Sequence, residues 1–205
     1  MTCTTLREAF SQVLERSDLS YTVEQLLAFA AEDTFGGRDT GNFPRLMSPY
    51  AVEGQFLYAM VRALRPRVAL EIGCADGGSA THILAALEVN GYGKLVSVDL
   101  NALAGGMIPK ALKSRWELVV GDARIIELPQ AEFMFEDSDH SLPNTLAILS
   151  RLKQMNPKCI LSHDYFYEIG VKQAFDQTFG DQVIAMSLKA EPINTGMACW
   201  ISKGS

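Results

Sequence analysis

Two groups of acidic residues and histidines in this chain suit cation binding and proton transfer. Asp137, Asp139 and His140 come directly after one apolar run, and His163 and Asp164 come at the end of another. Adjacent parallel strands end at the same edge of a sheet, so we expect these five side chains to converge. Carboxylate oxygens suit Mg²⁺, and a histidine in the set also admits Mn²⁺, Fe²⁺ or Zn²⁺.

Helix capping is the alternative explanation for part of this set. Asp139 and Ser141 precede a predicted helix that begins near residue 142, and both are suitable caps, so we expect capping for Ser141 and favour it for Asp139. Capping does not account for Asp137 or for the pair formed by His163 and Asp164. The third histidine of the chain, His82, is expected to be packed or exposed rather than to bind a ligand.

A run of small residues indicates a nucleotide-like ligand. Residues 71–79 lead from an apolar strand through Gly73, Ala75 and Gly77 into the start of a helix. Small residues at such a turn let backbone N–H groups approach a ligand at the helix N-terminus. The next predicted strand ends in Asp99, whose carboxylate can accept both hydroxyls of a ribose. The sequence therefore predicts a cofactor that contains a nucleoside.

Composition argues against several classes of partner. The 205 residues include 48% hydrophobic and 20% charged side chains, with a net charge of −6. No basic block is present to neutralise phosphates, so nucleic acid is not expected as a partner. No apolar run reaches the ~18 residues of a membrane span, there is no signal-peptide pattern, and the four cysteines are scattered. We therefore expect a cytoplasmic protein without a membrane partner.

Predicted strands and helices alternate along most of the chain, and they position these groups. Strands are predicted at residues 68–72, 95–99, 117–120, 133–136 and 159–163, and helices at about 79–89, 107–113, 142–155 and 169–179. This alternation is typical of an α/β fold with a doubly wound, mostly parallel sheet. Strands at 182–188 and 197–202 have no helix between them, which predicts a hairpin and a reversed last strand.

The first part of the chain is expected to form a helical N-terminal cap. Helices are predicted at 4–15 and from Thr22 to about 32, followed by a turn-rich loop at 34–47 and a helix that starts at Ser48. We interpret residues 1–205 as a single domain, with a cap and loop at 1–47 and a Rossmann-like core at 48–205. The loop is either a lid over a pocket or a plain connector.

These residues resemble those of class I S-adenosylmethionine-dependent methyltransferases. The closest resemblance is to the small metal-dependent O-methyltransferases of the catechol, caffeoyl-coenzyme A and macrolide-sugar types. An acid and three small residues at 71–77 are similar to the first motif of that class. The histidine three residues after Asp137 is similar to the pattern of the macrolide-sugar enzymes. The resemblance covers about residues 48–202.

The resemblance implies a role for each matching position. The residues implied to bind S-adenosylmethionine are Glu71, Gly73, Ala75, Gly77, Ser79, Asp99, Asp122, Ala123 and Asp137. Asp137, His163 and Asp164 are implied to hold a divalent metal, with Mg²⁺ expected first, and His140 is implied to take the proton of the acceptor hydroxyl. The family has Asp-Asn or Glu-Asp where this chain has His163-Asp164. The sequence therefore leaves open which of His163, Asp164 and Tyr165 contact the metal.

The implied reaction is methyl transfer to a hydroxyl of a small molecule, such as a phenol, a sugar or another secondary metabolite. The resemblance also implies a homodimer. One alternative is a metal-independent enzyme that methylates nitrogen, carbon or a carboxylate. A second is a nicotinamide-dependent oxidoreductase that uses the same glycine turn. A third is a binding module without turnover, against which the cost of burying idle acids and histidines argues.

Overall fold

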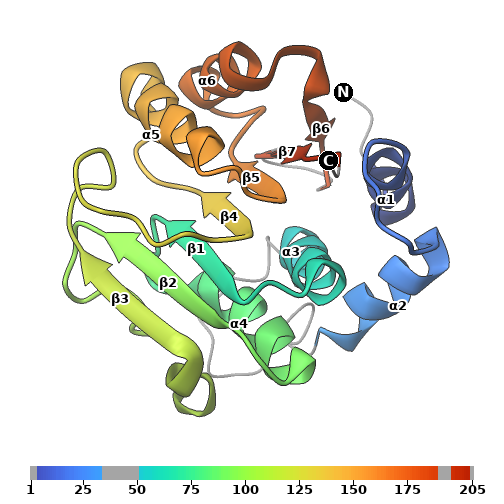
Figure 1. Ribbon diagram of the computed structural model, residues 1–205, viewed down its shortest axis with the longest axis horizontal. Coiled ribbons are helices and arrows are strands. Elements are labelled where there is room, and N and C mark those ends of the chain that lie inside the picture. Colours follow the sequence, from blue (N-terminus) through green and yellow to red (C-terminus); the bar gives the residue numbers. More distant parts are fainter. Residues whose placement is uncertain (1–3, 34–50, 189–194, 204–205) are drawn as a thin grey trace.

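The computed structural model describes residues 4–33, 51–188 and 195–203, which form a sheet with helices on both faces (Figure 1). The strands are β1 (Val68–Ile72), β2 (Lys94–Asp99), β3 (Trp116–Val120), β4 (Phe133–Glu136), β5 (Cys159–His163), β6 (Ile184–Met186) and β7 (Met197–Ile201). They lie in the order β3-β2-β1-β4-β5-β7-β6. β1 to β5 are parallel, and β7 runs antiparallel to both of its neighbours. The predicted α/β fold with a reversed last strand is confirmed.

The helices form a layer on each face of the sheet. They are α1 (Leu6–Glu15), α2 (Val23–Glu32), α3 (Ala51–Leu64), α4 (Gly78–Asn90), α5 (Leu142–Gln154) and α6 (Ile169–Phe179), with short 3₁₀ helices η2 (Lys110–Arg115) and η3 (Gly180–Gln182). Successive side chains of a strand point to opposite faces. On β1, Ala69 packs in the core cluster of α3 and α4, whereas Leu70 and Ile72 pack in that of α5 and α6. Burial on both faces explains why the parallel strands are nearly continuous apolar runs.

One predicted helix is wrong. Residues 107–113 were expected to be an α-helix, but the structure has the 3₁₀ helix η2 at Lys110–Arg115. Pro109 explains the difference, because it has no N–H for a helical hydrogen bond and disfavours the α conformation at Ile108.

The two N-terminal helices begin with capping boxes. Thr22 accepts a hydrogen bond from the backbone of Gln25, whose side chain accepts one from the backbone of Thr22 in return, as predicted. α2 packs against α3, and α1 lies near β6. Among the described residues, none from α1 or α2 lines the cavities described below. The predicted loop at 34–47 and the helix start at Ser48 lie outside the described residues.

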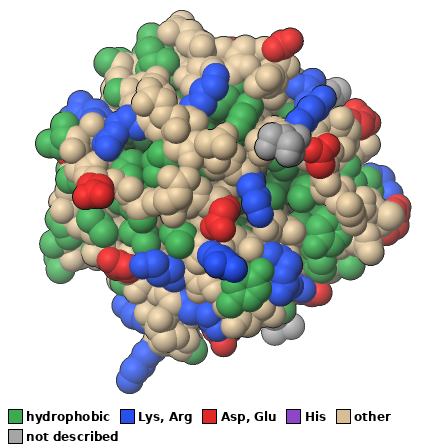
Figure 2. Space-filling model, viewed as in Figure 1, with side chains coloured by type: hydrophobic (Ala, Val, Ile, Leu, Met, Phe, Trp, Pro, Cys, Tyr) green, Lys and Arg blue, Asp and Glu red, His purple; other side chains and the backbone are tan. Residues whose placement is uncertain are grey.

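The surface charges are mixed, and the described cysteines are free thiols. Figure 2 shows Lys and Arg side chains interspersed with Asp and Glu on one face of the molecule. None of the helices in the described ranges is both long enough and apolar enough to cross a bilayer. Cys74, Cys159 and Cys199 are buried free thiols, and Cys3 lies outside the described residues.

The turn after β1 requires glycine at position 73. Gly73 has a left-handed φ of +85°, and a Cβ added there would lie 2.0 Å from the carbonyl oxygen of Asp137. The Gly73 N–H donates to the Val98 carbonyl at 2.9 Å, and the Asp137 N–H donates to the Ile72 carbonyl at 2.8 Å. The ends of β1, β2 and β4 are therefore joined at one point.

Gly73→Ala should destabilise the fold more than Gly91→Ala, which serves as its matched control. Gly91 ends α4 with a similar φ of +78°, but an added Cβ meets no atom within 4 Å. Each alanine should lower the free energy of unfolding by roughly 1–2 kcal/mol for its left-handed conformation. Gly73→Ala should lose a further ~1–3 kcal/mol, because the backbone at Asp137 must move. Urea unfolding measures both losses, and equal losses would contradict the close approach.

Candidate functional site

Two adjoining cavities open at the carboxyl ends of the parallel strands. The first cavity, about 350 Å³, lies beside the residues that follow β1, β2, β3 and β4. The second cavity, about 270 Å³, lies between α3, the start of α4 and the ends of β4 and β5. Gly73, Ala75 and Asp137 line both cavities. Doubly wound folds bind ligands at this position, where the strand order reverses between β1 and β4.

Asp99 lines the first cavity from the end of β2. Its Oδ2 accepts hydrogen bonds from the backbone N–H groups of Cys74 at 2.9 Å and Ala75 at 3.0 Å, and its Oδ1 accepts one from Asn101 at 2.8 Å. Burial alone would raise the pKa of Asp99, but these backbone donors lower it below the usual value. The carboxylate is therefore ionised and holds the glycine turn in place.

Asp122 and Ala123, which the family resemblance implies for cofactor binding, line the first cavity beyond β3. The carboxylate of Asp122 pairs with Arg124, with Nη2 and Oδ2 2.6 Å apart. The hydrogen bond from this guanidinium lowers the pKa of Asp122 to about 2. The rim of the cavity thus carries an ion pair rather than a lone acid.

Asp139 does not join the other acids but serves the start of α5, as the capping alternative predicts. Asp139 lines the first cavity, and its Oδ1 accepts a hydrogen bond from the Ser141 N–H at 2.7 Å. Ser141 is the N-cap residue of α5, but its own side chain makes no capping hydrogen bond. The need for a partner at the start of α5 therefore directs Asp139 away from the cluster.

Some of the predicted cofactor-binding residues of the glycine turn line a cavity, and one of them does not. Gly73 and Ala75 line both cavities, and Ser79 lines the second. Gly77 is the N-cap of α4 with a left-handed φ of +97° and is not among the residues that line either cavity. A Cβ added at Gly77 would lie 2.6 Å from Cγ1 of Ile108, so this glycine lets the turn close against that side chain.

Glu71 lies behind the turn and is not among the lining residues of either cavity. Its carboxylate is fully buried and accepts hydrogen bonds from Ser79 Oγ at 2.6 Å and Ser97 Oγ at 2.5 Å. Burial raises the pKa of Glu71 to about 7, although both hydroxyls oppose the shift. Ser79 therefore connects this carboxylate to the second cavity.

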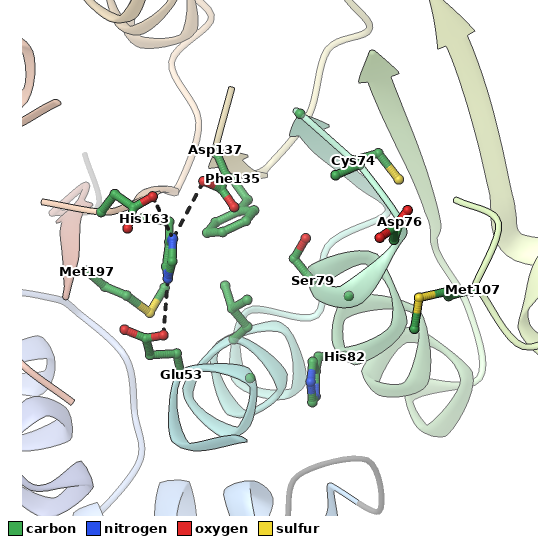
Figure 3. A pocket seen from close by; sticks show the side chains of 16 residues that line it. Glu53, Cys74, Asp76, Ser79, His82, Met107, Phe135, Asp137, His163 and Met197 are labelled. Atoms are coloured by element: carbon green, nitrogen blue, oxygen red, sulfur yellow. Dashed lines mark hydrogen bonds and ion pairs between the residues drawn. The ribbon is translucent and has the colours of Figure 1, made fainter. Parts of the chain in front are cut away.

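Three of the predicted metal ligands do come together. Atoms of Asp137, His163 and Asp164 lie within 4.8 Å of one another. Nδ1 of His163 is 3.4 Å from Oδ2 of Asp164 and 3.6 Å from Oδ1 of Asp137 (Figure 3). Two carboxylates and one imidazole around a small space fit a divalent cation. Tyr165 is not part of this group, because its hydroxyl donates to Asp176 at 2.6 Å.

His140 lies at the edge of this cluster. Its Nε2 is 3.4 Å from Oδ1 of Asp137 and 3.4 Å from Oδ2 of Asp164, and its Nδ1 is 3.9 Å from Oε1 of Glu168. The hydrogen bond with Asp137 raises the pKa of His140, although burial opposes the shift. Burial alone would raise the pKa of Asp137, but hydrogen bonds with His140 and His163 lower it to about 2.

Glu53, on α3, was missed by the sequence analysis. Its Oε2 accepts a hydrogen bond from Nε2 of His163 at 3.1 Å, and its Oε1 accepts one from Thr195 Oγ1 at 3.0 Å. The residue is only 3% exposed and lines the second cavity. Burial would lower the pKa of His163, but Asp137, Asp164 and Glu53 raise it. The sequence did contain a signal for Glu53, because it is an acid within the apolar stripe of a helix, and a buried carboxylate requires polar partners.

His82 is packed, as the sequence predicts. Its Nδ1 lies 2.7 Å from Oδ2 of Asp33, and both residues are buried. The ring packs against Gly54, where an added Cβ would lie 2.4 Å from Nε2. His82 nevertheless lines the second cavity, away from the pair formed by His163 and Glu53 (Figure 3).

Part of the chain that forms this site is similar to a known protein family. Residues 70–165 match the sequence model of a methyltransferase domain family. This segment of the chain is therefore similar to a methyltransferase domain. The matched segment runs from β1 through the glycine turn to the end of β5, and so includes Asp99, Asp137 and His163. A comparison with curated proteins finds no match.

Solved structures share the fold of this chain at low sequence identity. Cofactor-bound Rv0187 from MTB has a TM-score of 0.59 and 15% identity, over 99% of this chain and 100% of that one. The O-methyltransferase TomG from Streptomyces achromogenes, in complex with SAM, has a TM-score of 0.55 and 16% identity, over 95% and 96%. A structure named cmcI-D160 Mg-SAM has a TM-score of 0.54 and 18% identity, over 77% and 73%.

Glu71→Gln should change how stability depends on pH. The folded pKa of about 7 lies above the ordinary value of 4.5, so the folded state holds this proton more tightly than the unfolded state. That contribution is fully present below about pH 4.5 and is lost as the pH rises through about 7. Between pH 4.5 and 8 the free energy of unfolding should fall less in Glu71→Gln than in the wild type, by up to roughly 3 kcal/mol. Denaturant unfolding across this range measures the difference, and parallel pH curves would contradict the buried carboxyl.

Proposed function

We propose that this protein is an O-methyltransferase. It transfers the methyl group of S-adenosylmethionine to a hydroxyl of a small molecule, with a divalent metal ion at Asp137, His163 and Asp164. One observation carries the proposal: Asp137 lines both cavities and also belongs to the group of candidate metal ligands. A methyl donor along the glycine turn and an acceptor at the cation would therefore meet beside the same residue.

The donor fits the first cavity through its nucleoside. Asp99 is ionised and can accept hydrogen bonds from the ribose hydroxyls, while Asp122 and Ala123 flank the space for adenine. Gly73 and Ala75 let the donor pass close to the backbone into the second cavity. There the methionine part of the donor would lie near Ser79, which is already hydrogen-bonded to Glu71.

The second cavity suits a small acceptor. Leu57, Phe135, Met107 and Met197 contribute apolar lining, and the acids and histidines lie on the remaining walls. When bound, S-adenosylmethionine supplies an electrophilic methyl group, and a divalent cation supplies charge that lowers the pKa of the acceptor hydroxyl. Holding donor and acceptor in line is worth on the order of 7–11 kcal/mol in favourable models.

His140 is the proposed proton acceptor. Its side chain is 30% exposed, and it lies beside both aspartates of the cluster. A partly exposed imidazole can take a proton from the acceptor hydroxyl and release it to water. Two structural neighbours support the assignment by analogy, since TomG is an O-methyltransferase in complex with SAM and the cmcI structure is named with both Mg and SAM.

The proposed function is tested by cofactor binding and turnover together. S-adenosylhomocysteine should bind the purified protein in a calorimetric titration, and NAD should not. Incubation with S-adenosylmethionine and a panel of phenols, sugars and amines should yield O-methylated products. EDTA should abolish turnover, and an added divalent metal should restore it. Full activity in EDTA, or methylation of nitrogen or carboxylate acceptors alone, would favour the metal-independent alternative.

His140→Ala should separate catalysis from donor binding. Loss of a general base should lower turnover roughly 10²–10⁴-fold. The affinity for S-adenosylhomocysteine should stay within about twofold of the wild type, because His140 is not among the residues that line either cavity. A parallel loss of donor affinity would show that this histidine supports the fold of the site instead.

A further inference from the structure

The candidate metal site contains a nitrogen donor. His163 contributes an imidazole nitrogen beside oxygens of Asp137 and Asp164, with all three ligand atoms within 4.8 Å of one another. Mg²⁺ binds almost exclusively to oxygen and keeps several of its waters. Imidazole favours first-row transition metals, and a mixed set of nitrogen and carboxylate donors is typical of their sites. The donor set is thus unlike one built for Mg²⁺.

A buried carboxylate determines which nitrogen of His163 faces the aspartates. Oε2 of Glu53 lies 3.1 Å from Nε2 of His163, and a carboxylate oxygen in this position accepts a hydrogen bond from a ring N–H, which places a proton on Nε2. Nδ1 then faces Asp137 and Asp164 at 3.6 and 3.4 Å. Hydrogen bonding of a ligating histidine to a carboxylate in this way fixes its tautomer and makes it a better metal ligand.

Glu53 is itself held in place. It is 3% exposed, and its second oxygen accepts a hydrogen bond from Thr195 Oγ1 at 3.0 Å. Glu53 comes from α3, Thr195 precedes β7, and His163 ends β5, so three separate elements fix the ring. A histidine at the surface would have no such support. Burying an imidazole and a carboxylate costs free energy, so we infer that the ring has a functional role.

We propose that this site selects a first-row transition-metal ion, such as Mn²⁺ or Fe²⁺, over Mg²⁺, and that Glu53 is the positioning residue that directs His163 toward it. The inference rests on the proposed function, which places a divalent cation at the same three residues. It adds the class of metal and the role of a residue on α3. The structure named with Mg among the neighbours is 18% identical, so the metal in that protein does not determine the one here.

Electron paramagnetic resonance of bound Mn²⁺ shows whether a nitrogen atom ligates the metal. Protein stripped with EDTA is titrated with Mn²⁺ alone, and free Mn²⁺ is followed by electron paramagnetic resonance. We expect one bound Mn²⁺ per chain, with spin-echo modulation from a directly bound ¹⁴N. His163→Glu makes the three ligands all oxygen and should abolish this modulation. Modulation that persists in His163→Glu would assign the nitrogen to another histidine and would overturn the proposal.

The selectivity is measured by competition in the same samples. Carboxylate sites in general bind Mn²⁺ more tightly than Mg²⁺, so the decisive quantity is the change in the ratio of the two dissociation constants. His163→Glu should reduce the preference for Mn²⁺ over Mg²⁺ by at least about tenfold. An unchanged ratio would overturn the proposed role of the imidazole.

Glu53 is tested by a variant and by a matched control at the carboxylate beside His82, the other histidine that lines this cavity with a buried acid as its partner. Glu53→Gln should weaken Mn²⁺ binding by roughly 10–100-fold, the usual effect of losing the carboxylate behind a ligating histidine. Asp33→Asn alters the corresponding carboxylate beside His82 and should leave Mn²⁺ affinity unchanged. Thermal unfolding confirms that both variants are folded. Equal effects of the two substitutions would contradict a specific role for Glu53.

The outcomes also separate this inference from the proposed function. Binding of Mg²⁺ as tight as that of Mn²⁺, without nitrogen modulation, overturns the inference while leaving a metal-dependent methyltransferase in place. Absence of binding by either ion overturns both the inference and the metal in the proposed function. Titration with S-adenosylhomocysteine, carried out on the same stripped protein, reports on the methyl donor independently of either result.

Discussion

The site depends on the contact between the backbone at Gly73 and the backbone at Asp137. A side chain at position 73 would overlap the carbonyl oxygen of Asp137, so the strands can end side by side only with glycine there. This contact brings the turn that limits the first cavity against the first of the three clustered ligands. The separation between a bound donor and the acid cluster is therefore set by main-chain packing rather than by flexible side chains.

Two buried glutamates reinforce this junction from within the sheet. Glu71 on β1 lies opposite Ser97 on β2, and Glu136 on β4 lies opposite Ser162 on β5. Each glutamate accepts hydrogen bonds from the facing serine and from a second serine in the segment that follows its own strand. Burial raises the pKa of both carboxyls to about 7. Neutral or charged, each one ties a strand end to its neighbour and to the loop that lines a cavity.

Features that depend on hydrophobic periodicity or on where strands end could be predicted from the sequence. Contacts between residues far apart in the chain could not. The bounds of β1, β4 and β5 follow from apolar runs bounded by turns, and the grouping of Asp137, His163 and Asp164 follows from parallel strands that end together. The capping role of Asp139 follows from the sequence as well, because its carboxylate accepts a local hydrogen bond at the start of α5. Glu53 could not be assigned, because its partner is 110 residues away and the angle between α3 and the sheet is not encoded locally.

The reversed strand has a consequence for how the molecule assembles. β7 is the last strand in the chain, yet it lies between β5 and β6, so β6 has no partner in the sheet until β7 is present. Thr195, just before β7, hydrogen-bonds Glu53 across 142 residues, a contact with a large loop-closure cost. The parallel strands can assemble from neighbouring segments, whereas the support for His163 must wait for the final strand to insert. We therefore expect the first cavity to form early during folding and the wall of the second cavity that carries His163 to form last.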